Sequence, residues 1–143
     1  MYLPQLRGEV SQGDIFDSLP TVYIQGVGLR PKMRSMRAIL LTHDCEYDKP
    51  KTTTVLIAEV WPLTDVDPGS RGYIVQNRVL AAFFLEAFAD VLPESYVDFR
   101  SISRLEKGIV EAQSTEGKRL ASLTVEARLA LQRQLALFLG LDR

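Results

Sequence analysis

The stretch Thr-Thr-Val-Leu-Ile-Ala-Glu-Val-Trp at residues 53–61 decides the fold class of this chain. β-Branched and aromatic residues suit a pleated, half-buried surface, so these nine residues are predicted to form a β-strand. Within residues 21–28, Val22, Ile24 and Val27 fall near alternate positions, which is the spacing of a second strand. Similar reasoning predicts three more strands, at residues 13–16, 37–42 and 96–105.

The C-terminal segment carries the pattern of one amphipathic helix. Thr124 is placed to cap its N-terminus, and Glu126 adds negative charge to its first turn. Gly140 stands where a glycine commonly ends a helix. Apolar side chains recur at helical spacing between these ends and form a stripe that consists of Ala127, Leu131, Leu135 and Phe138. We expect this stripe to pack across an open sheet or the mouth of a barrel.

The remaining segments are predicted mostly as connections. Residues 47–53, 64–72 and 106–118 are polar and read as loops, with an Asp-Pro-Gly turn inside residues 65–72. Residues 79–91 suit either a helix or a strand, and a strand is favoured for their first half. The chain is therefore expected to form a single domain over residues 1–143. Its predicted class is α+β and β-dominated, with a small bent antiparallel sheet or SH3-like barrel and a C-terminal amphipathic helix.

Composition is that of an ordinary globular protein, with 46% apolar and 24% charged residues. The only cysteine, Cys45, excludes an intramolecular disulfide and points to a reducing compartment. No apolar run approaches the roughly 20 residues of a membrane span, and the N-terminus lacks a signal-peptide pattern. A cytoplasmic location without membrane contact is expected. The net charge of −1 gives no overall attraction to nucleic acid, so polyanion binding would need a local patch.

Residues 42–49 concentrate reactive side chains directly after an apolar strand, where functional groups often project. If the strand continues, His43, Cys45 and Tyr47 share one face, because side chains alternate along a strand. One hypothesis is a thiol hydrolase in which His43 activates Cys45 as a nucleophile.

Other interpretations of this segment stay open. A hard cation such as Mg²⁺ could be bound by the three carboxylates, which are Asp44, Glu46 and Asp48. Zinc fits poorly, because a structural zinc site needs four ligands and the chain has one histidine and one cysteine. A structural corner would need no chemistry at all: Cys45 would be a small buried side chain and the acids would be solvated. We expect no bound metal and no other cofactor.

Four cations lie within eight residues, and they are Arg30, Lys32, Arg34 and Arg37. Such a cluster can meet a phosphate backbone despite the near-neutral total charge. It is expected in an exposed loop before the strand at residues 37–42, where it either contacts RNA or is simply solvated. Trp61, at the end of the best strand, is either a core residue or a surface for stacking.

The order of these segments resembles a known family. The segments are, in order, Gly13-Asp14-Ile15, a loop with arginines, the apolar strand at residues 37–42, and residues 54–64, which end in Trp-Pro-Leu-Thr. Over about residues 7–64 this order is similar to that of the MazF/PemK toxin superfamily. That resemblance implies an SH3-like barrel and a dimeric, metal-independent endoribonuclease. It implies catalytic roles for Thr64 and for an arginine, with Arg37 and Arg34 as the candidates, while the cationic cluster predicts RNA contacts through Arg30, Lys32 and Arg34.

The chain also departs from the family pattern. Gln12 replaces the arginine before Gly-Asp-Ile, Ala38 replaces a proline, and residues 43–46 have no place in the pattern. We therefore expect a homodimer that binds single-stranded RNA, and whether it also cleaves RNA stays open. The alternative is a non-catalytic interaction protein of a phage, defence or toxin–antitoxin locus, with a protein partner such as an antitoxin.

Overall fold

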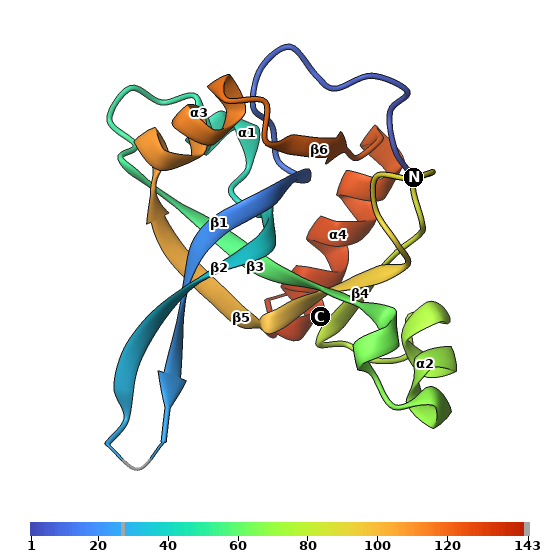
Figure 1. Cartoon of the computed structure of the whole chain (residues 1–143). Helices are drawn as coiled ribbons and strands as arrows, with labels where there is room; N and C mark the ends of the chain where they lie inside the picture. Colours follow the sequence, from blue (N-terminus) through green and yellow to red (C-terminus); the bar gives the residue numbers. More distant parts are fainter. Residues whose placement is uncertain (27, 142–143) are drawn as a thin grey trace.

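The computed structural model describes residues 1–26 and 28–141. In this part of the chain, one antiparallel sheet is formed by β1 (Asp14–Gln25), β2 (Arg30–Leu40), β3 (Thr54–Pro62), β4 (Ala82–Leu85), β5 (Ser95–Glu106) and β6 (Arg119–Ser122), in the order β4-β5-β3-β2-β1-β6 (Figure 1). The helices are α1 (Asp44–Tyr47), the 3₁₀ turn η1 (Leu63–Asp65), α2 (Pro68–Val75), α3 (Lys107–Thr115) and α4 (Val125–Phe138). The predicted α+β, β-dominated class with a bent antiparallel sheet and a C-terminal helix is confirmed.

The sheet bends so strongly that β1 meets β5, although β3 and β2 separate them in the sheet order. The backbone N–H of Val22 in β1 donates a hydrogen bond of 3.0 Å to Ser103 Oγ in β5. The β1–β2 register shifts between Phe16 and Leu19 of β1, and the β3–β5 register shifts between Ala58 and Glu59, where the extra residues lie in β5. Such bulges increase the local twist and bend of a strand, and here they help the sheet to curl back on itself.

Two apolar clusters pack on opposite faces of the sheet, because alternate residues of each strand point to opposite sides. In β3, Ala58 and Val60 belong to the cluster that α4 covers through Leu131. Val55 and Ile57 belong to the other cluster, which includes Tyr47 of α1 and Val110 of α3. Both faces of the central strand are therefore buried, which explains the near-continuous apolar run at residues 55–60.

The N-terminal hairpin differs from the prediction. Residues 13–16 and 21–28 were predicted as separate strands, but β1 runs without interruption from Asp14 to Gln25 and absorbs the turn-like residues between them in a bulge. Val27, the last member of the predicted pattern, lies outside the described residues. Arg30 to Arg37 belong to β2 rather than to a loop. Their sequence lacks strand character, so the register with β1 holds them extended.

Three further elements were predicted as loops or were not predicted. α2 begins within the expected Asp-Pro-Gly turn, because Pro68 occupies the first helical position, where its missing N–H costs nothing. α3 occupies most of residues 106–118, and its Val110 is fully buried against the sheet. β6 is four residues long and is stabilised by pairing with β1. In residues 79–91 the strand favoured for the first half is confirmed as β4.

The C-terminal helix forms as predicted. Thr124 caps α4 by accepting a hydrogen bond of 3.2 Å from the backbone N–H of Ala127. Gly140 follows the helix with a φ of 74°, the left-handed conformation that glycine adopts readily. Across the described residues, no helix combines the length and apolar character needed to cross a membrane.

We predict that Leu131→Ala destabilises the protein by about 2–5 kcal/mol, since this side chain has no exposed surface and its loss leaves a cavity under α4. Leu129→Ala is the matched control on the same helix, because Leu129 is 59% exposed and its loss should change stability by less than about 0.5 kcal/mol. Urea denaturation measures both. Equal losses would show that α4 does not use the predicted stripe to cover the sheet.

Candidate nucleic-acid interface

The β1–β2 hairpin extends beyond the body of the sheet as an arm, which consists of residues 21–25 of β1 and 30–34 of β2 (Figure 1). Its register pairs Thr21 with Arg34, Tyr23 with Lys32 and Gln25 with Arg30. Directly opposed residues of an antiparallel pair share a face, so these six side chains form one face of the arm, called here the basic face. The cations on it recur at every second residue of β2, about 6.8 Å apart along the strand.

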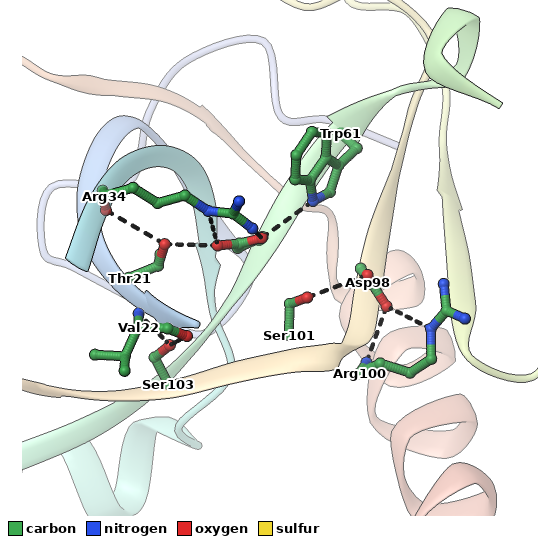
Figure 2. A network of polar contacts seen from close by, with 9 residues as sticks. Thr21, Val22, Arg34, Trp61, Asp98, Arg100, Ser101 and Ser103 are labelled. Atoms are coloured by element: carbon green, nitrogen blue, oxygen red, sulfur yellow. Dashed lines mark hydrogen bonds and ion pairs between the residues drawn. The ribbon is translucent and has the colours of Figure 1, made fainter. Parts of the chain in front are cut away.

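A buried carboxylate lies at the root of the basic face. Glu59 of β3 is only 1% exposed, and Arg34 binds both of its oxygens, with Nη2 2.7 Å from Oε1 and Nε 3.1 Å from Oε2 (Figure 2). Thr21 Oγ1 donates to Oε2 at 2.6 Å, and Trp61 Nε1 donates to Oε1 at 3.2 Å. A buried charge is tolerated when it is paired and its lone pairs are satisfied, and four hydrogen bonds meet that condition here.

The same contacts fix the arginine. The hydrogen bonds to Glu59 raise the pKa of Arg34, and the guanidinium carbon lies 4.3 Å from the ring centre of Tyr23 and 5.3 Å from that of Trp61. Both rings are partly exposed. Arg34 therefore holds two aromatic side chains at the base of the arm, while its own positive charge is balanced by Glu59.

Two cations of the basic face are available to a ligand. Arg30 and Lys32 are exposed, and neither has an ion-pair partner among the described residues. Together with Tyr23 and Trp61 they combine uncompensated positive charge with aromatic rings. Proteins that bind single-stranded nucleic acid combine these two features, using cations for phosphates and rings for bases.

The opposite face of the arm is apolar, and its exposed side chains are Val22, Ile24 and Met33. The Val22 N–H points away from β2 toward Ser103. Every second pair of an antiparallel ladder has the same orientation, so the backbone groups of the pairs Pro20–Ser35 and Ile24–Pro31 also point outward from the hairpin. Pro20 and Pro31 lack the N–H that would point outward from β1 and β2 at these positions, which disfavours pairing with a further strand. On this side of the arm, the surface open to contact is therefore formed by exposed apolar side chains rather than by backbone N–H groups.

The three residues assigned to catalysis have different partners. Arg37 follows Arg34 by three positions, so it lies on the other face of β2, and its Nη2 is 3.4 Å from Asp17 Oδ1. Thr64 belongs to the 3₁₀ turn after β3, and its carbonyl oxygen accepts a hydrogen bond of 3.1 Å from Arg71. Within the described residues, no hydrogen bond connects Thr64 to these arginines.

The segment around His43 is a short helix and not a continuing strand, so the predicted sharing of one face by His43, Cys45 and Tyr47 is wrong. His43 caps α1, and its Nδ1 accepts from the Cys45 N–H at 3.2 Å. Cys45 is exposed rather than buried, with Sγ 3.1 Å from the same Nδ1. Tyr47 points inward to the core. The helical turn brings thiol and imidazole together, which an extended strand would not have done.

The three acids of this segment are directed to different partners. Asp44 accepts hydrogen bonds from the Gln12 N–H and from Arg128 Nη1, each at 2.7 Å. Glu46 forms an ion pair of 2.7 Å with Lys49, and Asp48 ends the helix. Among the described residues, no group of three acidic, histidine or cysteine side chains is positioned to hold a metal ion. Asp44 instead ties the start of β1 to α4.

Glu59 and Tyr23 belong to this site but were not predicted from the sequence. One signal was present for Glu59: it shares the alternation of Val55 and Ile57 within an apolar strand, so it had to face a buried side. An acid in that position requires a partner. The chain matches no protein-family profile and no curated protein sequence. The likeness of residues 7–64 to the MazF/PemK superfamily thus stays a resemblance.

We predict that Arg34→Met destabilises the protein by about 3 kcal/mol or more, because it leaves Glu59 buried without its counter-ion. Glu59→Gln should cost less, roughly 1–2 kcal/mol, since the amide keeps part of the network and Arg34, 34% exposed, can be solvated. Urea denaturation at neutral pH measures both variants. Arg30→Met, on the same face without an ion pair, is the control and should change stability by less than about 0.5 kcal/mol. A loss for Arg34→Met no larger than the control would contradict the anchoring role of the pair.

The Asp44 contacts predict a pH dependence. Partial burial acts to raise the pKa of Asp44, but the hydrogen bonds from Gln12 and Arg128 outweigh it and lower the pKa below its ordinary 3.8. A lowered folded-state pKa stabilises the protein above the unfolded-state value, and this stability is lost as the pH falls through the folded-state value. Asp44→Asn should therefore be less stable than the wild type at neutral pH, and the gap should close in acid. Thermal unfolding between about pH 7 and pH 2 measures this, and a gap that stays constant would contradict it.

Proposed function

We propose that this protein binds single-stranded RNA through the basic face of its arm. The observation that carries the proposal is the register of β1 and β2, which places Arg30 and Lys32 beside Tyr23 on one exposed face. Cations spaced at every second strand residue can follow a phosphate backbone, and partly exposed rings can stack on unpaired bases. Bases in a duplex are already stacked, which is why the aromatic component favours a single strand.

The small number of unpaired cations on the arm also limits the length of nucleic acid that it can bind. With a net charge of −1, the protein has no overall field that would attract a long duplex. Two uncompensated cations on the arm correspond to two phosphate contacts, so affinity should be modest and should depend weakly on salt. This is the behaviour of a short RNA segment held by charge and stacking together. A cytoplasmic location, where such RNA occurs, forms part of the proposal.

Cleavage is the activity that the family resemblance adds to binding. A metal-independent cleavage would need a cation free to stabilise the charge on phosphorus in the transition state. Arg34 is neutralised by Glu59, and Arg37 lies on the opposite face with Asp17. This arrangement supports binding better than it supports cleavage, so we propose an RNA-binding protein and make cleavage an outcome of the test.

A protein-interaction role is the second candidate. The exposed Val22, Ile24 and Met33 support it, because three large apolar side chains on one side of a projecting arm favour contact with another protein surface. A second copy of the chain or an antitoxin-like partner would bury them. Both roles could be served by the same arm, since the two faces point in opposite directions.

For the RNA-binding proposal, we predict that Arg30→Gln and Lys32→Gln each weaken binding and each reduce the slope of log Kd against log salt by about 0.7. Tyr23→Ala should weaken binding by roughly 1–3 kcal/mol without changing that slope, because stacking is uncharged. Fluorescence anisotropy of a labelled mixed-sequence single-stranded RNA, measured at several salt concentrations, gives both quantities.

Lys118→Gln is the control, since this lysine is exposed and lies outside the arm. Binding that survives all three arm substitutions, or falls equally in the control, would overturn the proposal. The same RNA run on a denaturing gel with EDTA tests cleavage, and discrete fragments that disappear in Thr64→Ala would show that the protein is a nuclease.

A further inference from the structure

A second cationic site lies outside the basic face of the arm, beside α1. It is a hollow of about 570 Å³ formed where the β2–β3 connection passes β5. Its polar lining consists mainly of hydroxyl and cationic side chains, among them Thr42, His43, Lys49, Lys51, Thr53 and Arg104. No residue of the basic face lines it.

The charges in the hollow do not balance. Lys49 is neutralised by Glu46 at 2.7 Å. Lys51 and Arg104 are exposed and have no ion-pair partner in the described part of the chain. Two uncompensated positive charges facing one hollow match a doubly charged anion, and arginine and lysine together are the usual partners of phosphate.

Neutral donors add directionality. His43 Nδ1 accepts the Cys45 N–H, so the neutral ring carries its proton on Nε2, which has no hydrogen-bond partner among the described residues. Thr42 Oγ1 accepts the Leu56 N–H at 2.8 Å, which leaves its own hydroxyl hydrogen available to donate. Thr53 contributes another hydroxyl to the lining. These donors suit the oxygens of a phosphate group.

An apolar surface completes the site. Leu56 lines the hollow and is 41% exposed, and Val55 and Leu41 lie beside it. Sites for small molecules generally combine such apolar surface with a few convergent polar groups, in volumes of about 300–1,000 Å³. We infer that this hollow binds a phosphate monoester of nucleotide size, with the phosphate between Lys51 and Arg104 and the sugar or base on Leu56.

The test is a titration with uridine 5′-monophosphate followed by ¹H–¹⁵N NMR. Saturable shifts are expected at the amides of Thr42, His43 and Thr53. Lys51→Gln and Arg104→Gln should each weaken the affinity at least about tenfold, and uridine without phosphate should not bind. Arg100→Gln is the matched control for Arg104, because Arg100 is also exposed on β5 but already binds Asp98 at 3.2 Å. All the substituted residues are exposed, so the spectra away from the hollow should show an unchanged fold.

The phosphate could belong to a free nucleotide or to the 5′ end of an RNA. Comparing 5′-phosphorylated with 5′-hydroxyl RNA separates these sources: higher affinity for the phosphorylated RNA that is lost in Arg104→Gln identifies the RNA end, and equal affinity identifies the free nucleotide. Substitution of Arg30 and Lys32 should leave nucleotide binding unchanged, which keeps this test independent of the arm. No shifts up to about 10 mM nucleotide, or shifts that survive both Lys51→Gln and Arg104→Gln, would overturn the inference.

Discussion

The buried carboxylate of Glu59 is the group on which the position of the arm depends. It lies on the central strand β3 and accepts hydrogen bonds from both strands of the arm, through Thr21 of β1 and Arg34 of β2. A solvated carboxylate could not fix a projecting hairpin, because surface ion pairs contribute little. Burial changes this, since the charge can remain in the interior only while those partners stay in place. The direction of the arm is thereby coupled to the core of the sheet.

The register of the arm then determines what it presents. With Arg34 opposite Thr21, the cations and Tyr23 fall on one face, and Val22, Ile24 and Met33 fall on the other. A slip of one residue in one strand would place apolar side chains opposite cations and mix both faces. The Glu59–Arg34 pair prevents this slip, because only one register brings the arginine over the carboxylate. Structural stability and the separation of the basic face from the apolar face thus have the same cause.

The segment that concentrates reactive residues also has a structural role. Asp44 ties the start of β1 to α4 through Gln12 and Arg128, so this acid holds elements together. The turn that follows exposes Lys51 and a row of threonines beside His43, which creates the cationic hollow. Several residues of the hollow thus come from a segment that was expected to be a plain loop, and the pairing of β3 with β5 brings Arg104 to the same place.

The sequence by itself determined the elements whose pattern is strong over many residues. β3 was predicted from its run of β-branched and apolar residues, and β5 and α4 from periods of two and of about 3.6 residues, all of which are local properties. The fold class follows from these three. α3 and β6 were not predictable in this way, because each is short and each is stabilised by a partner distant in the sequence, as β6 is by β1. Only the tertiary structure decided that Arg30 to Arg34 form a strand, that Arg37 is turned away from them, and that Glu59 is the partner of Arg34. The first two outcomes depend on the pairing of β2 with β1, and the third brings together residues 25 positions apart, a distance that no local pattern encodes.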